Sequence, residues 1–211
     1  MKPILFNTEM VRAILDGRKT VTRRVIKTES GEPLRYGLGF VIAGDRKSIG
    51  KYAYGNRAAG EPMRCVKPPY KVNDILYVRE TWALEGESEN YITGEKRTYY
   101  AYKADPFNRN GNWRPSIHMP KEAARIFLKV TGVRVERLWD MRLDDFKNEG
   151  TTATSISPED DLNYRFNFSN LWDSTIKKDQ LQYYSWGANP YVWVIEFEVI
   201  DKAAALKEGQ A

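Results

Sequence analysis

The chain has 211 residues, of which 42% are hydrophobic and 29% are charged, a composition that is typical of globular proteins and excludes an intrinsically disordered chain. The single cysteine, Cys65, excludes an intramolecular disulfide framework. No apolar run approaches the ~20 residues of a membrane helix, and the N-terminus has no secretion signal, so we expect a cytoplasmic protein with no membrane partner.

The net charge of +5 is concentrated at the start of the chain. Residues 1–28 contain seven Lys or Arg and two acidic residues, so the remaining chain is neutral. A local positive patch attracts phosphates and steers nucleotides or nucleic acid toward it. The alternative is a solvated basic surface without a partner.

The first half of the chain predicts one helix and two strands. Asn7 caps an amphipathic helix that ends at Gly17 in the left-handed conformation, and a strand over 21–25 follows. Residues 28–72 are rich in glycine and lack a periodic apolar pattern, so they are interpreted as an insertion or a long excursion. The segment DILYVRETWA, 74–83, predicts one strand.

The second half alternates short strands and short helices. The sequence predicts strands at 98–102, 126–138 and 191–200, helices at 121–125, 143–149 and around 166–178, a polar loop at 151–161, and a frayed tail at 201–211. Gly132 lies where the apolar alternation changes phase, which indicates a β-bulge or a barrel corner. We therefore expect one domain over 1–211, α+β or mainly β, built on a small closed or half-closed β-barrel decorated by short helices.

The stretch GRKTVTRR, 17–24, crowds four cations and two threonines after the first helix. Four positive charges within seven residues repel one another, which favours an anionic ligand or a chemical role. The stretch matches the pattern G-x-K-x-x-T-x-R and resembles the signature of ASCH domains, a group within the PUA-like superfamily.

Further segments resemble the same family in the same order, over nearly the whole chain outside the glycine-rich insertion. They are NDILYVRETW, IFLKVTGVRVERL, LDDFKNEG and NPYVWVIEFEVI, while NWRPSIHMP and LWDS are similar to the longer phage and prophage members. Asn73 stands where the family usually has glycine, and asparagine tolerates a positive φ there.

The resemblance implies a PUA-like barrel with one of two functions. Small bacterial ASCH proteins are amidohydrolases that deacetylate N4-acetylcytidine with a lysine, a threonine and a glutamate, which match Lys19, Thr22 and Glu149. Most of them are much shorter than this chain. PUA-like barrels also bind RNA or modified bases, so a non-catalytic RNA or modified-nucleotide binding module is the alternative. A nuclease is a third, less supported interpretation.

The residue types are consistent with amide hydrolysis. A threonine hydroxyl needs a neighbouring base, and lysine acts as that base only when burial or like charge lowers its pKa. We expect Thr22 to attack the carbonyl with Lys19 as base, and Glu149 to orient Lys19 or deliver a proton to the leaving amine. Arg24, with Arg23, would hold an anionic group or developing charge. Since strand positions three apart point to opposite faces, convergence of Lys19 and Thr22 requires a loop or a bulge between them.

Each of these side chains also has a structural interpretation. Lys19 and Thr22 could support the fold, and Glu149 could be a helix-end residue paired with a surface lysine. Glu80 and Trp82 are candidate substrate-binding residues, as an acceptor for amino groups and a stacking platform. Alternatively, Glu80 could form an exposed ion pair with Arg79, and Trp82 could be a core residue.

The remaining candidates are weaker, and no cofactor is predicted. Trp113 and Arg114 are more typical of loop packing than of base stacking. One histidine, His118, and one cysteine give no zinc ligand set, so no metal is implied. His118 is interpreted as structural or as part of the site's rim, and Cys65 as buried or incidental rather than nucleophilic. Neither a Walker loop nor a dinucleotide fingerprint is present.

Overall fold

The computed structural model describes residues 1–28, 34, 39–41, 50–55, 63–107, 111–153 and 161–209. Much of the glycine-rich segment 28–72 and most of the expected polar loop 151–161 therefore lie outside the described residues. The described elements are α+β, as the sequence predicts. The chain divides into two compact units, each assembled from separate stretches of sequence.

Unit 1 comprises Met1–Thr20, Asn73–Val130 and Phe197–Ala211. Strand β1 pairs in parallel with β6, and β6 pairs antiparallel with the start of β9. Its core includes Ile75, Tyr77 and Phe127. The elements that lie wholly in this unit are β1 (Lys2–Leu5), α1 (Thr8–Leu15), β6 (Ile75–Arg79), β7 (Trp82–Glu89), β8 (Lys96–Tyr102), the 3-10 turns Ser116–His118 and Lys121–Ala123, and α5 (Lys202–Glu208).

Helix α1 begins and ends where the sequence predicts. The Asn7 side chain accepts a hydrogen bond from the Met10 amide at 2.8 Å, which caps the helix. Gly17 has φ +71°, the left-handed conformation that ends a helix at little steric cost. Lys19 follows this turn and lies before strand β2 rather than inside it.

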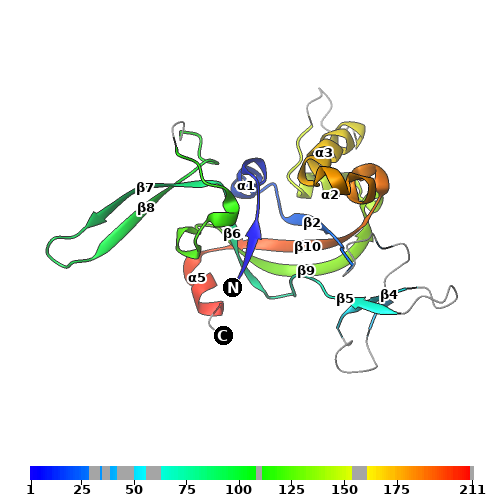
Figure 1. Cartoon of the computed structure of the whole chain (residues 1–211), viewed down its shortest axis with the longest axis horizontal. Helices are drawn as coiled ribbons and strands as arrows, with labels where there is room; N and C mark the ends of the chain where they lie inside the picture. The colour runs from blue at the N-terminus through cyan, green and yellow to red at the C-terminus, as the bar shows by residue number, and fades with distance from the viewer. Residues whose placement is uncertain are drawn as a thin grey trace. The chain divides into compact units, whose positions relative to one another are not determined.

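Two expectations for unit 1 are wrong. The single strand expected over 74–83 is divided at Glu80 and Thr81, because β7 leaves β6 and pairs with β8 in a hairpin that extends away from the other elements of the unit (Figure 1). The tail expected to be frayed forms α5, because Asp201 caps it by accepting from the Ala204 amide at 2.8 Å and Ala205 is buried in the core.

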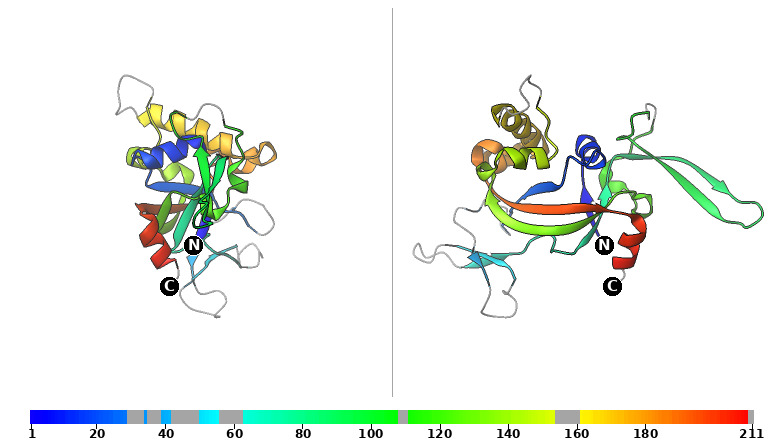
Figure 2. Two further views of the ribbon diagram at one scale, coloured as in Figure 1. Left: turned by 90° about the vertical axis from the view of Figure 1, so that its left-hand side faces the viewer. Right: turned by 180° about the vertical axis from the view of Figure 1, so that it is seen from behind.

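Unit 2 comprises Val21–Val72 and Thr131–Glu196. Strand β10 pairs antiparallel with β2, with Ile195 opposite Thr22. Helices α2 and α3 cover one side of these strands, and β4 and β5 lie on the other side (Figures 1 and 2). The elements that lie wholly in this unit are β2 (Val21–Val25), β3 (Gly39–Phe40), β4 (Tyr52–Tyr54), β5 (Arg64–Val66), the 3-10 turns Leu138–Asp140, Lys178–Gln180 and Trp186–Ala188, α2 (Leu143–Asn148), α3 (Asp161–Thr175) and α4 (Leu181–Tyr184).

The sheets are open, so the closed barrel that the sequence suggests is wrong for the described residues. Strands β9 (Phe127–Arg137) and β10 (Tyr191–Ile200) run through both units, and the strand order is β1-β6-β9-β10-β2. A barrel closes only when its first and last strands pair, and here β1 and β2 are the two edges. The glycine-rich segment contributes a separate three-stranded sheet, β3-β4-β5, where no strand is predicted. No helix in the described part of the chain is long and apolar enough to cross a membrane.

Candidate functional site

The buried polar side chains of the described residues coincide closely with the candidates chosen from the sequence. Charged side chains are rarely buried unless they are paired, so a buried charged side chain indicates a functional site or a structural ion pair. Five of the six such residues are candidate site residues, and Thr28 is the exception: Lys19, Thr22, Arg23, Thr28, Glu80 and Glu149.

Thr22 and Arg24 are in direct contact in unit 2. They are two residues apart on β2, so their side chains share one face of the strand. The half-buried Arg24 donates from Nη1 to the Thr22 Oγ1 at 3.1 Å, and the same nitrogen donates to the Arg23 carbonyl at 3.2 Å. Burial lowers the pKa of Arg24, and the negative charge of Glu149 opposes this shift. Arg24 therefore lies within the electrostatic influence of Glu149.

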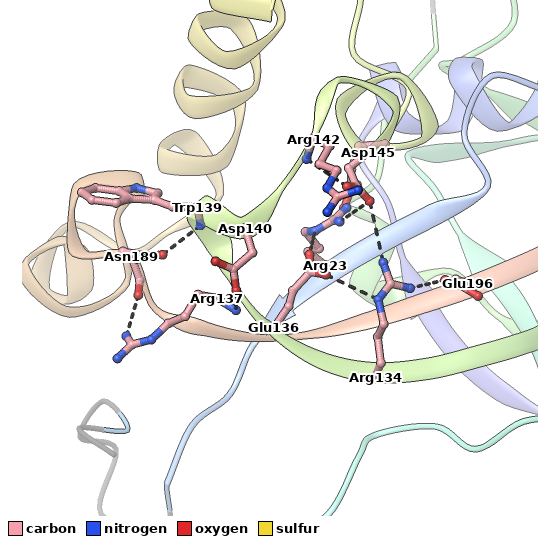
Figure 3. A network of polar contacts seen from close by, with 11 residues as sticks. Arg23, Arg134, Glu136, Arg137, Trp139, Asp140, Arg142, Asp145, Asn189 and Glu196 are labelled. Carbon is pink, nitrogen blue, oxygen red and sulfur yellow. Dashed lines mark hydrogen bonds and ion pairs between the residues drawn. The ribbon is translucent and has the colours of Figure 1, made fainter. Parts of the chain in front are cut away.

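Arg23 is the centre of a buried ion-pair cluster, which is defined by Arg23 with Glu136, Asp145 and Glu149. Figure 3 labels Arg23, Glu136 and Asp145 of this cluster. Its Nε donates to Glu136 at 2.7 Å, its Nη2 to Asp145 at 2.8 Å, and its Nη1 to Glu149 at 3.3 Å. Burial lowers the pKa of Arg23, but the charges of Glu149 and Glu136 and the hydrogen bonds to Asp145 and Glu136 raise it by more. The guanidinium thus joins β2 to β9 and to the end of α2.

Arg134 closes this cluster on its outer side (Figure 3). It lies 3.4 Å from Glu136 and 3.7 Å from Asp145, and it also pairs with Glu196 on β10. Its side chain is 43% exposed, whereas that of Arg23 is fully buried. Arg23, Arg24 and Arg134 thus face four carboxylates, so these seven side chains carry no excess of positive charge.

Helix α2 presents Glu149 to this cluster. The helix ends at Asn148, Glu149 is its C-cap, and Gly150 has φ +83°, which agrees with the predicted helix and its glycine stop. Burial raises the pKa of Asp145, but hydrogen bonds from the Arg142 amide and from Arg23 lower it by more. Asp145 in the first turn of α2 and Glu149 at its C-cap are four residues apart, and both contact Arg23.

The basic run 17–24 does not form an exposed basic patch. Lys19 and Arg23 are buried and Arg24 is half-buried. Arg18 is the exposed cation of the run, and it pairs with Asp16 at 2.9 Å. The charge that the sequence concentrates here is directed into the protein rather than toward solvent.

Lys19 belongs to unit 1, where it is 1% exposed. Its backbone amide donates to the Ala13 carbonyl at 2.9 Å, and its Nζ lies 5.7 Å from the centroid of the Phe6 ring. An ammonium over an aromatic face is attracted by the ring quadrupole. The turn after α1 therefore brings this Nζ near the Phe6 ring.

Glu80 and Trp82 lie in unit 1 and have protein partners. Arg125 holds both carboxylate oxygens of Glu80, with Nε at 2.9 Å and Nη2 at 3.1 Å. Burial raises the pKa of Glu80, and this hydrogen-bonded arginine opposes the shift. Trp82 packs edge-on against Tyr100, and the Arg114 guanidinium lies 5.1 Å from its ring centroid. The expected exposed pair of Arg79 and Glu80 is replaced by this buried pair with Arg125.

The remaining candidates are peripheral. His118 is exposed, and Cys65 is half-buried in β5. Arg114 is exposed, and its backbone forms a bridge with Trp82. Within the described ranges, no three His, Cys, Asp or Glu side chains are grouped so that they could hold a metal ion.

Sequence reasoning missed the partners of the buried arginines. Glu136, Asp145 and Arg134 surround Arg23, and Arg125 holds Glu80, but none of the four was a candidate. A signal for two of them exists in VRVER, where Arg134 and Glu136 alternate with valines on a predicted strand.

No family model, curated protein or solved structure matches the chain.

Proposed function

We propose that the protein is an ASCH-type amidohydrolase that acts on an acylated nucleoside such as N4-acetylcytidine, with Thr22 as the nucleophile. The observation that supports this proposal is the burial of Lys19, Thr22 and Glu149, which are 1%, 1% and 4% exposed. These are the three positions to which the family resemblance assigns catalysis. Buried polar groups are typical of catalytic sites, where desolvation strengthens electrostatic interactions.

The contact between Arg24 and Thr22 suits a nucleophilic hydroxyl. The guanidinium donates to Oγ1 and so leaves the hydroxyl proton available to a base. It also stabilises the negative charge that develops on this oxygen as the proton leaves. Arg24 is therefore assigned to activation of Thr22. The assignment of Lys19 as the base depends on the resemblance, together with its burial three residues before Thr22.

The reaction then proceeds through an acyl-enzyme. Lys19 accepts the Thr22 hydroxyl proton while Oγ1 bonds to the carbonyl carbon of the substrate amide. The C–N bond breaks, and the amine leaves with the proton that Lys19 took from Thr22, which Lys19 returns directly or Glu149 relays to the amine. Water hydrolyses the threonine ester, which releases the carboxylic acid and restores the hydroxyl. The products from N4-acetylcytidine are cytidine and acetate.

Arg23, Glu80 and Trp82 have protein partners, so we assign none of them to contact with the substrate. The three donor nitrogens of Arg23 face three carboxylates, and both oxygens of Glu80 face Arg125. The ring of Trp82 contacts Tyr100 and Arg114. We assign Arg23 in particular to holding Glu149 at the end of α2.

A binding module for RNA has less support. Proteins that bind nucleic acid without catalysis neutralise phosphates with exposed lysines and arginines. Here the basic run is largely buried, and the seven charged side chains around Arg23 carry no positive excess. These observations favour a small, uncharged ligand over an RNA backbone.

The test measures the turnover of N4-acetylcytidine to cytidine, and chromatography detects the cytidine formed. We expect turnover by the wild type and a loss of at least about a thousandfold in kcat for Thr22→Val, which keeps the side-chain shape. Thr28→Val is the matched control because it makes the same change at another buried threonine. Glu149→Gln should lose activity more than Glu136→Gln, although both remove a carboxylate from Arg23. Absence of wild-type turnover, combined with salt-sensitive RNA binding, would establish the binding module instead.

A further inference from the structure

Thr151 lies two residues beyond Glu149, on the turn that ends α2. Consecutive Cα atoms are about 3.8 Å apart, so the Cα atoms of Thr151 and Glu149 are separated by at most about 7.6 Å. Gly150 donates to the Lys147 carbonyl at 2.8 Å and Thr151 donates to the Phe146 carbonyl at 3.1 Å. The chain therefore folds back on the helix end that presents Glu149.

The backbone around Thr151 is fixed on both sides. Phe146, which accepts from the Thr151 amide, is fully buried in the core of unit 2. The Asn167 side chain of α3 donates to the Thr152 carbonyl at 2.8 Å, and Ala153 packs against the same core. Because threonine is branched at Cβ, its side chain also has few rotamers. The backbone that carries the Thr151 side chain is thus held in place before any ligand arrives.

This hydroxyl is buried, yet Oγ1 has no hydrogen-bond partner among the described residues. Buried polar groups almost always have partners, so each exception needs an explanation. Four side chains in the described part of the chain have such an atom: Tyr54, Arg79, Trp82 and Thr151. Thr151 is the one that is adjacent to a proposed catalytic carboxylate.

We propose that the Thr151 hydroxyl is a substrate-binding group of the site that contains Thr22 and Glu149. It hydrogen-bonds an uncharged polar group of the substrate, such as an amide or ring carbonyl of the base. An anionic group is disfavoured there, because the Glu149 carboxylate is only two residues away. This assignment rests on the proposed function. The Thr151 hydroxyl would then have a hydrogen-bond partner only when the substrate is bound.

The test compares Thr151→Val, which removes the hydroxyl and keeps the shape, with Thr151→Ser, which keeps the hydroxyl. We expect KM for N4-acetylcytidine to rise about tenfold in Thr151→Val, the loss of one neutral hydrogen bond, and to be restored in Thr151→Ser. The thermal midpoint of the free Thr151→Val protein should be equal to or higher than that of the wild type. Tyr54→Phe is the matched control: it removes another unpartnered hydroxyl, on β4, and should leave KM unchanged.

The outcomes separate this inference from the proposed function. Wild-type turnover with an unchanged KM in Thr151→Val would overturn the inference and leave the proposed function intact. No turnover by the wild type would overturn the proposed function. Calorimetric binding of cytidine would then decide the role of Thr151. Weaker binding by Thr151→Val supports it, and equal binding, or no binding by the wild type, refutes it.

Discussion

Replacing Arg23 by methionine removes the positive centre of the buried cluster while keeping a long, flexible side chain. The substitution takes a hydrogen-bonded cation away from Glu136, Asp145 and Glu149. Arg134 still contacts Glu136 and Asp145, so those two carboxylates keep a partner. Glu149 is only 4% exposed and therefore loses most. We expect the free energy of unfolding to fall at neutral pH.

The expected loss is about 3–5 kcal/mol, the cost of removing one member of a buried ion pair and leaving its partner charged. Arg134→Met is the matched control, because the same chemical change is made at a 43% exposed arginine that pairs with two of the same carboxylates. For an exposed pair the expected loss is about 0–1 kcal/mol. The difference between the two variants therefore measures the effect of burial.

The pH dependence has a definite sign. Because the pKa of Asp145 is lowered in the folded protein, its contribution to stability is present at neutral pH and is lost as the pH falls through its folded pKa. The difference between wild type and Arg23→Met should therefore shrink as the pH falls from about 7 to about 3. Urea denaturation monitored by tryptophan fluorescence at several pH values gives these free energies. A loss no larger than that of Arg134→Met, or a difference that grows in acid, would refute the reasoning.

Two further predictions concern unit 1. Burial raises the pKa of Tyr102 to about 12, so its phenolate absorbance should be missing near pH 10 and appear near pH 12, and Tyr102→Phe should abolish that late step. The free energy of unfolding should fall over the same range, because the unfolded chain loses this proton first. The chain has thirteen tyrosines, so the comparison with Tyr102→Phe decides: loss of absorbance near pH 10 rather than near pH 12 in this variant would contradict the assignment. Gly17→Ala should destabilise the protein by about 1–2 kcal/mol, because φ is +71° and a Cβ there gains no contact within 4 Å. Gly17→Asn should lose less, and equal thermal midpoints for both variants and the wild type would refute the argument.

Local signals predicted the elements that hold the candidate residues. The cap at Asn7, the stop at Gly17 and the stop at Gly150 each depend on the conformational preference of one residue, so they can be read from a few neighbouring positions. The helix that presents Glu149 and the strand that holds Thr22 were predicted for this reason. The cap at Asp201 and the helix-favouring alanines that follow it were an equally local signal for α5, which the prediction of a frayed tail overlooked.

Long-range pairings could not be predicted in this way. Arg23 meets its three carboxylates across more than a hundred residues of sequence, and no local pattern specifies which acidic residues they are. The sequence suggested a ligand for Arg23, whereas its partners are in the protein. The partner of Glu80, Arg125, is likewise 45 residues away in the sequence.

The path of the chain between the two units has a practical consequence for the design of truncated fragments. The backbone passes from one unit to the other at 20–21, 72–73, 130–131 and 196–197, and the last two crossings fall within β9 and β10. No single cut releases an intact unit, since each is interrupted in sequence by the other. Expression trials with truncated fragments should therefore give insoluble or unfolded products. Isolating either half would require new loops that rejoin its separated pieces.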